Sequence, residues 1–165
     1  MDDREFDEFY RASFPRLVGQ LTVMTGSFGE AQDCVQEAFV RAWLSRASVG
    51  ASGSAEAWVR TVAWRLAVSR WRRAKRALGL LDRSTSQAVP EAPGIDRTAL
   101  TTALAQITPE QRRAIVLHHL CDLSVAEVAI ETSAAVGTVK ARLSRGRAAL
   151  ATLLDEHSTE VAQHD

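Results

Sequence analysis

Residues 123–145 read LSVAEVAIETSAAVGTVKARLSR, and this stretch decides the fold. Ser124, followed three residues later by Glu127, has the pattern of a capping box and predicts a short helix from Val125 to Glu131. After a turn, apolar residues at helical spacing predict a longer, basic helix from about Val136 to Leu154. A short helix, a tight turn and a basic helix together indicate a helix-turn-helix, whose second helix enters the major groove of DNA.

The outward face of this last helix has the chemistry of a DNA-reading surface. Val139, Leu143 and Leu150 point inward, and the other sides present the residues Thr138, Lys140, Ala141, Arg142, Arg145 and Arg147. Arginine can bind guanine edges with two hydrogen bonds, whereas flanking cations usually meet phosphates. An unrelated basic amphipathic helix is the alternative interpretation.

Helical periodicity accounts for the rest of the chain. In the first half it covers three stretches: Arg4–Thr25, in which Pro15 is expected to kink or split the helix, Ser27–Ser45, where Ser27 and Glu30 form a capping box, and Ala55–Leu78. The aperiodic, Ser- and Gly-rich segment from Arg46 to Gly53 predicts a flexible loop. In the second half, a helix is expected near Arg97–Ala105, and a capping box at Thr108–Gln111 begins another that ends near Leu120.

Residues 81–96 contain two prolines and no helical period, which is typical of a linker. The predicted fold is therefore all-α, with two small helical domains at 1–80 and 97–155. The remaining residues, 156–165, are expected to form a solvated, frayed tail.

Charge is segregated along the chain although the formal net charge is zero. The first forty residues are rich in acids, whereas Ala57–Leu81 and Ser133–Leu154 contain none and carry several Arg and Lys side chains. Two separate basic elements favour two contacts with a polyanion. The alternative is that each basic run is a solvated helix face.

The helix Ala55–Leu78 combines tryptophans with cations. Its side opposite the expected buried residues carries Arg60, Trp64, Val68, Trp71 and Lys75. Unstacked bases of single-stranded DNA stack on indole rings while cations follow the phosphates, so this face suits a melted strand. Alternatively, Trp64 and Trp71 pack against another helix or the linker.

The helix Ser27–Ser45 has an outward side of mixed character. Asp33, Gln36, Glu37 and Arg41 lie there beside the apolar Val40 and Leu44. Apolar residues on an outward face favour a protein-binding surface, unless they simply touch the neighbouring loop.

Several classes of protein have little support. Cys34 and Cys121 are far apart without a CxxC pair, and the adjacent His118 and His119 lack further ligands at suitable spacing. No catalytic nucleophile, base, glycine-rich phosphate loop, signal peptide or apolar stretch of membrane-spanning length stands out. We therefore expect a cytoplasmic protein that is no enzyme, needs no cofactor and does not insert into membranes.

Two sets of motifs occur in order along the chain. The first consists of residues 31–43 (AQDCVQEAFVRAW), residues 58–63 and the basic run Arg70–Arg76, and the second of residues 107–112, 123–129 and 136–145. The first set is similar to conserved region 2 and the second to region 4 of the sigma-70 family, so the sequence resembles this family in the compact form of the extracytoplasmic-function sigma factors. Together these motifs cover most of the chain outside the linker and the tail.

The resemblance implies a role for each surface. Core RNA polymerase, through its clamp helices and flap, would be the main protein partner, and the region 2 contact would use Asp33, Gln36, Glu37, Val40, Arg41 and Leu44. The melted minus-ten strand would be held by the loop from Arg46 to Gly53 together with Arg60, Trp64, Arg65, Trp71, Arg72 and Lys75. The minus-thirty-five duplex would be read by Thr138, Lys140, Ala141, Arg142, Arg145 and Arg147. An anti-sigma factor is a further candidate partner.

Three positions in region 4 depart from the usual pattern. Ser133 replaces the turn glycine, and Ala135 replaces a serine cap, which costs about 1 kcal/mol. Gly146 inside the last helix costs about 1 kcal/mol relative to alanine. These departures predict a less rigid reading helix.

Two other functions compete with a sigma factor. A stand-alone helix-turn-helix regulator would bind duplex operators, but it leaves the Trp/Arg helix and the mixed face of Ser27–Ser45 without a role. The other is a helical protein that only sequesters a partner, but this function leaves the two basic helices without a role.

Overall fold

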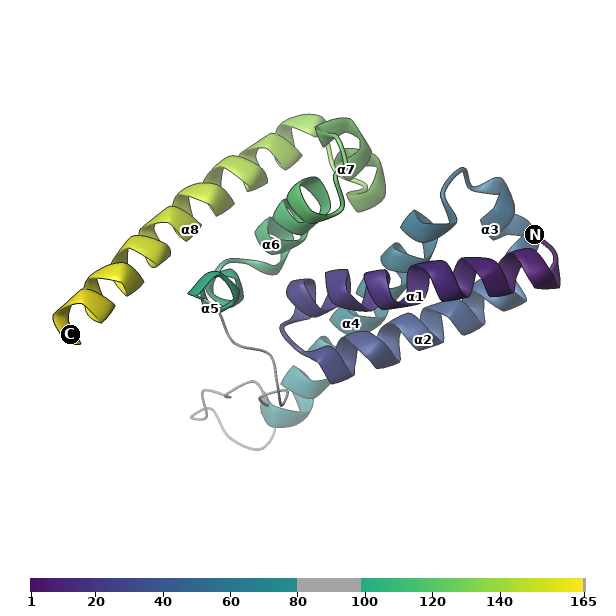
Figure 1. Ribbon diagram of the computed structural model, residues 1–165, viewed down its shortest axis with the longest axis horizontal. Helices are drawn as coiled ribbons and strands as arrows, with labels where there is room; N and C mark the ends of the chain where they lie inside the picture. Colours follow the sequence, from purple (N-terminus) through teal and green to yellow (C-terminus); the bar gives the residue numbers. More distant parts are fainter. Residues whose placement is uncertain (80–98, 165) are drawn as a thin grey trace. The chain divides into compact units, whose positions relative to one another are not determined.

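The computed structural model describes residues 1–79 and 99–164, and in these residues every regular element is a helix (Figure 1). The chain divides into two compact units, Met1–Ala92 and Pro93–Asp165. The division point and the predicted linker 81–96 lie outside the described residues. The prediction of an all-α fold with two helical domains is confirmed.

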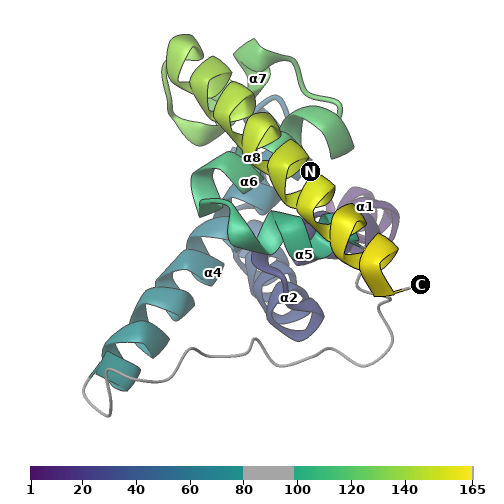
Figure 2. The ribbon, with the colours of Figure 1, turned by 90° about the vertical axis from the view of Figure 1, so that its left-hand side faces the viewer.

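The first unit contains the helices α1 (Asp3–Thr25), α2 (Phe28–Leu44), α3 (Arg46–Ala51) and α4 (Ala55–Gly79). Helix α2 packs against both α1 and α4, and α1 also contacts α4 (Figures 1 and 2). Apolar side chains from these three helices form the core, among them Leu17, Leu21, Met24, Val35, Ala38, Val59 and Ala63. Burial of these side chains is the main force that joins the helices.

An aromatic cluster extends this core between α1 and α2. The ring of Phe39 on α2 lies 5.0 to 6.2 Å, between centroids, from four rings of α1: Phe6, Phe9, Tyr10 and Phe14. Trp43 adds an edge-to-face contact with Phe6 at 5.1 Å. These spacings are those that favour aromatic pairs, so the cluster fixes the register between α1 and α2.

Helix α1 is continuous through Pro15, so of the two expected effects, a kink or a split, the split is wrong. Proline removes a single backbone donor, and the surrounding hydrogen bonds and packing keep the helix intact. A capping box that the sequence reading missed begins α1, because Asp2 accepts from the Glu5 amide and Glu5 accepts from the Asp2 amide, both at 2.8 Å. Gly26, in the left-handed region at φ 77°, ends α1 as expected.

The predicted loop from Arg46 to Gly53 is wrong over most of its length, because α3 occupies Arg46–Ala51. Val49 is buried and anchors this short helix to the first unit. The Arg46 guanidinium lies 4.4 Å from the centroid of the Trp43 ring and donates to the Trp43 carbonyl at 3.2 Å. Tertiary packing therefore overrides a local sequence with weak helix propensity.

The second unit contains α5 (Ala99–Gln106), α6 (Pro109–Ile115), α7 (Val125–Thr132) and α8 (Val136–His164). Helix α8 packs against each of the other three. The core is aliphatic and includes Leu104, Leu117, Val128, Val139 and Leu143. The expected helix, turn and longer helix of residues 123–145 are present.

The predicted helix starts are confirmed by side-chain caps. Ser27 accepts from the Glu30 amide at 3.3 Å, and Thr108 accepts from the Gln111 amide at 3.2 Å. At Ser124 the capping box is complete, because the Glu127 carboxylate also accepts from the Ser124 amide at 2.7 Å. Ser27 and Thr108 have only the first of these two bonds.

The end of the helix that starts at Pro109 is wider than expected. A π-helical turn, η1 (Val116–Leu120), follows α6, and the Cys121 amide donates to the Val116 carbonyl five residues earlier at 3.0 Å. His118 Nδ1 lies 2.7 Å from the Leu123 carbonyl, which ties this turn to the segment before α7.

Helix α8 contradicts one expectation and shows a second effect of Gly146. The residues predicted as a frayed tail, 156–165, continue α8 as far as His164. Gly146 lies against α6, where a Cβ atom would approach Ile115 Cδ1 to 2.7 Å and Gln111 Cβ to 3.3 Å. Its missing side chain thus lets α8 approach α6, a role that helix propensity alone does not reveal.

Candidate protein-binding and nucleic-acid-binding surfaces

The outward side of α2 has the mixed surface that the sequence predicts. Val40 and Leu44 are 56% and 76% exposed, so the neighbouring segment does not cover them. Asp33, Gln36 and Arg41 are exposed beside them, and Glu37 is half-buried. Apolar side chains this exposed, with charges around them, are typical of a protein-docking surface.

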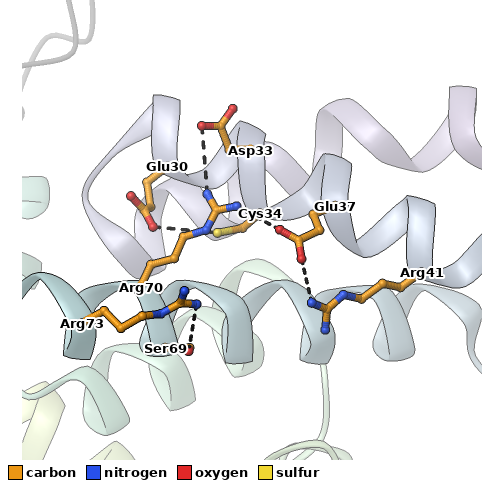
Figure 3. Close-up of polar contacts among 8 residues, drawn as sticks. All are labelled: Glu30, Asp33, Cys34, Glu37, Arg41, Ser69, Arg70 and Arg73. Atoms are coloured by element: carbon orange, nitrogen blue, oxygen red, sulfur yellow. Dashed lines mark hydrogen bonds and ion pairs between the residues drawn. The ribbon is translucent and has the colours of Figure 1, made fainter.

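An ion-pair network joins this face to α4 (Figure 3). Arg70 of α4 approaches Glu37 Oε2 with Nη2 at 3.0 Å and Asp33 Oδ2 with Nη1 at 4.0 Å. Arg41 approaches the other oxygen of Glu37 at 2.6 Å. The pKa of Glu37 lies below its ordinary value. The hydrogen bond from Arg41 is the largest cause, and the bond from Arg70 lowers the pKa further.

Cys34 lies beneath this network as a core residue. Its side chain is fully buried, and burial raises the pKa of the thiol to about 11. The thiol is therefore protonated at neutral pH and a poor nucleophile, in agreement with the prediction of a small core side chain.

Helix α4 presents the predicted tryptophan and cation surface between Trp64 and Lys75. Trp71 is 56% exposed, and Lys75 Nζ lies 4.9 Å from the centroid of its ring. Arg65 and Arg72 are exposed, whereas Trp64 is half-buried. The alternative that another helix covers the tryptophans therefore fails for Trp71 among the described residues.

Arg60 does not lie on this outward face, and that part of the prediction is wrong. Its side chain is only 5% exposed, and Nη1 donates to Gln20 Oε1 of α1 at 3.1 Å. The nearby Glu56 accepts from Ser13 at 3.0 Å and is also paired with Arg16. Arg60 thus belongs to a polar seam between α1 and α4, where it has a structural role.

The helix-turn-helix presents most of the predicted reading residues to solvent. Thr138, Lys140, Arg145 and Arg147 are exposed, and Ala141 and Arg142 are half-buried. The Nε atom of Arg147 donates to the Leu143 carbonyl at 3.2 Å, which holds this side chain along its own helix. A short, cationic face of this kind can enter a major groove.

A backbone conformation and a hydrogen bond shape the turn before α8. Ser133 adopts the left-handed region at φ 52°, a conformation that favours glycine, the usual residue of the family at this position. Arg113 of α6 donates to the Glu131 carbonyl at 3.4 Å. The turn therefore forms without glycine, and it is supported from α6.

Sequence reasoning missed the roles of two residues. Arg70 was grouped with the basic run of α4, although its guanidinium faces the acids of α2. Gly146 was treated as a weakness of α8, although it allows close packing. The acid spacing of α2 could have suggested a partner for Arg70, but no local signal indicates the contact at Gly146.

The described residues hold no group of three His, Cys, Asp or Glu side chains arranged for a metal ion. In the same residues, no helix combines the length and the apolar character needed to cross a membrane.

Comparison with known proteins identifies two family regions. Residues 9–77 match the model of sigma-70 region 2, and residues 97–150 match the model of sigma-70 region 4. The regions coincide with the helices of the first and second units respectively.

Curated relatives and a solved structure agree with these matches. The chain is 34% identical over 140 residues to the ECF RNA polymerase sigma factor SigL of Mycobacterium tuberculosis, covering 81% of this chain and 79% of that protein. It is 30% identical to SigM of the same species, over 97% of this chain and 82% of that protein. The sigma factor RpoE from Bartonella quintana, solved with the anti-sigma factor NepR, has a TM-score of 0.81 at 26% identity, over 92% of this chain and 98% of that chain. The chain therefore belongs to the sigma-70 family and is an extracytoplasmic-function RNA polymerase sigma factor.

Proposed function

We propose that this sigma factor divides promoter recognition among three surfaces. The outward face of α2 binds core RNA polymerase, α4 holds the melted minus-ten strand between Trp64 and Lys75, and α8 reads the minus-thirty-five duplex. Sigma factors are initiation factors and not enzymes, so the chemistry of RNA synthesis belongs to the polymerase. The chain would work in the cytoplasm, where bacterial transcription takes place.

The observation that carries the proposal is the exposure of Val40 and Leu44 within a charged face. Exposed apolar residues supply the desolvated centre of a protein interface, and the surrounding charges, including Asp33 and Arg41, supply its polar rim. We propose the clamp helices of core polymerase as the partner of this face and the flap as the partner of the second unit.

The proposed strand-binding surface of α4 consists of Trp64, Arg65, Trp71, Arg72 and Lys75. Trp71 offers an exposed ring for base stacking, and its neighbours offer cations for phosphates. Helix α3 belongs to the same proposal, since it precedes α4 in the segment that the family resemblance assigns to the minus-ten strand. Arg60 is left out because it is buried.

The proposed duplex-reading surface of α8 consists of Thr138, Lys140, Ala141, Arg142, Arg145 and Arg147. Arg145 is exposed and free of the backbone bond that holds Arg147 along its helix, so it is our first choice for a base contact. An anti-sigma factor is a further proposed partner, supported by the complex of the similar Bartonella quintana protein.

Runoff transcription with core polymerase tests the three surfaces separately. The double variant Val40→Asp/Leu44→Asp should abolish stable association with core on every template. Trp71→Ala should impair transcription from a duplex promoter more than from a pre-melted one. Arg145→Ala should weaken initiation only where a minus-thirty-five element is present.

Two results would contradict the proposal. Unchanged core affinity in the Val40→Asp/Leu44→Asp variant would remove α2 from the polymerase interface. Specific binding of duplex operators without core, together with no promoter-dependent transcript, would favour a stand-alone regulator instead.

A further inference from the structure

Arg70 differs from the other cations of the carboxyl half of α4. It opens the run that continues with Arg72, Arg73, Lys75 and Arg76, and charge alone would assign all five to phosphates. Arg70 is half-buried, however, whereas the four that follow are exposed. Its guanidinium faces α2, as Figure 3 shows.

The acids that Arg70 meets lie one helical turn apart on α2. Asp33 and Glu37 stand at positions i and i+4, where two like charges repel each other. The two terminal nitrogens of Arg70 engage both acids, Nη2 with Glu37 at 3.0 Å and Nη1 with Asp33 at 4.0 Å. The cation thus offsets a repulsion that α2 would otherwise carry on its outward face.

Glu37 is held from both sides. Arg70 forms an ion pair with its Oε2 atom, and Arg41 forms one with its Oε1 atom at 2.6 Å. A carboxylate with both oxygens engaged has lost most of its rotational freedom before any partner arrives. Pre-ordered side chains reduce the entropy that association must remove, so such a face binds more tightly than a mobile one.

We infer that Arg70 is a positioning residue for core polymerase binding: it orients Asp33 and Glu37 on α2 and does not serve the melted strand. This inference rests on the proposed role of α2 as the polymerase-binding face. It assigns the first cation of the basic run to the protein interface, and the later cations remain with the nucleic acid.

Binding of the full-length protein to immobilised core polymerase tests the inference. Arg70→Gln should lower core affinity by about threefold to fivefold, the range expected for a partly exposed ion pair. Arg70→Lys keeps the charge but loses the planar fork, so it should fall between wild type and Arg70→Gln. The matched control is Arg73→Gln. Arg73 lies on the same helix, and the bond that it forms among the described residues is to Ser69 of that helix, at 3.3 Å (Figure 3), so its replacement should leave core affinity unchanged.

A double-mutant cycle distinguishes positioning from a general loss of structure. Because Arg70 acts largely through Glu37, the loss of core affinity in Arg70→Gln/Glu37→Gln should be smaller than the sum of the two single losses, and only the weaker contact with Asp33 remains to be lost. Near-ultraviolet circular dichroism should show the same aromatic packing in each variant. Additive losses in the cycle, or wild-type core affinity in Arg70→Gln, would overturn the inference.

The outcome is separable from failure of the proposed function. If Val40→Asp/Leu44→Asp leaves core affinity intact, α2 is not the docking face and both ideas fall. If that variant loses core binding while Arg70→Gln retains it, the docking face stands and only the role of Arg70 is rejected.

Discussion

At the scale of single residues, Gly146 has two opposing effects on α8. Its backbone freedom weakens the helix, while its missing side chain leaves space for Ile115 of α6. Gly137, near the start of the same helix, has nothing within 4 Å of an added Cβ atom. These two glycines therefore form a matched pair, because an added methyl group would meet another helix at Gly146 and open space at Gly137.

We predict that Gly146→Ala destabilises the second unit by about 1–3 kcal/mol, because overpacking outweighs the gain in helix propensity. Gly137→Ala should instead stabilise it by up to about 1 kcal/mol. Urea unfolding followed by far-ultraviolet circular dichroism measures both. Ile115→Val removes the Cδ1 atom that lies in the way, so it should restore part of the loss in Gly146→Ala; equal stability of the single and double variants would contradict the packing explanation.

The ion pairs of Glu37 with Arg41 and Arg70 predict that the stability of the fold depends on pH. Since its pKa in the folded protein lies below the ordinary value of 4.5, the pairing stabilises the fold above pH 4.5 and this contribution fades as the pH falls through the folded pKa. Carbon-13 NMR titration of the carboxyl group should show the low pKa directly. Arg41→Gln should raise that pKa more than Arg70→Gln does, and the reverse order would be inconsistent with the geometry.

At the scale of elements, α3 depends on packing more than on its own sequence. Val49 is its buried residue, and Arg46 fastens its first turn to Trp43. Its other residues, which include Gly50 and three alanine or serine side chains, add little to the core. Removal of one anchor should therefore open this element without unfolding the helices around it.

We predict that Val49→Ala lowers the free energy for local opening of α3 by about 2 kcal/mol. Hydrogen exchange should become faster at residues 46–51 and stay nearly constant in α1 and α2. Ala47→Gly, at an exposed position of the same helix, is the control for helix propensity alone. If that control opens α3 as much as Val49→Ala does, the anchor is not the buried side chain.

Helix starts could be predicted from sequence because a cap is a local signal. Ser124 with Glu127 and Thr108 with Gln111 place hydroxyls within three residues of the amides that they accept from. The contact at Gly146 and the burial of Arg60 could not, because each depends on a partner far away in the sequence. The helix at Arg46–Ala51 could not either, because it depends on the burial of Val49 in a core that several helices build. Helical spacing places Arg60 opposite the apolar residues of α4, yet its side chain is buried and bonds to Gln20 of α1.

For the surfaces proposed for function, too, local features could be predicted from the sequence and contacts between helices could not. Val40 and Leu44 could be assigned to an outward face by periodicity within α2, and both are exposed. Arg70 could not be separated from its cationic neighbours, since only the packing of α4 on α2 shows which of them meets an acid.

At the scale of the whole molecule, the two units contain separate cores. The first is built from α1, α2 and α4, and the second from helices packed on α8. The matches to sigma-70 region 2 and region 4 fall on either side of the division. This organisation leads us to propose that each unit folds without the other.

We predict that fragments 1–80 and 97–165 each unfold cooperatively and that each keeps the midpoint it has in the intact chain. Far-ultraviolet circular dichroism of the fragments and of the full-length protein checks this. A fragment that is unfolded alone, or that is stabilised when the other is added, would show that the units depend on each other.

The aromatic cluster around Phe39 has a spectroscopic consequence. All four tryptophans, the single tyrosine and all five phenylalanines precede residue 72, so the second unit, with α8, contains no Trp, Tyr or Phe ring. Intrinsic fluorescence of the intact protein therefore comes from the first unit alone. The exposed indole of Trp71 would therefore report, without a label, on the strand binding that we propose for α4. Binding of α8 to the proposed minus-thirty-five duplex would give no such signal unless a dye were added.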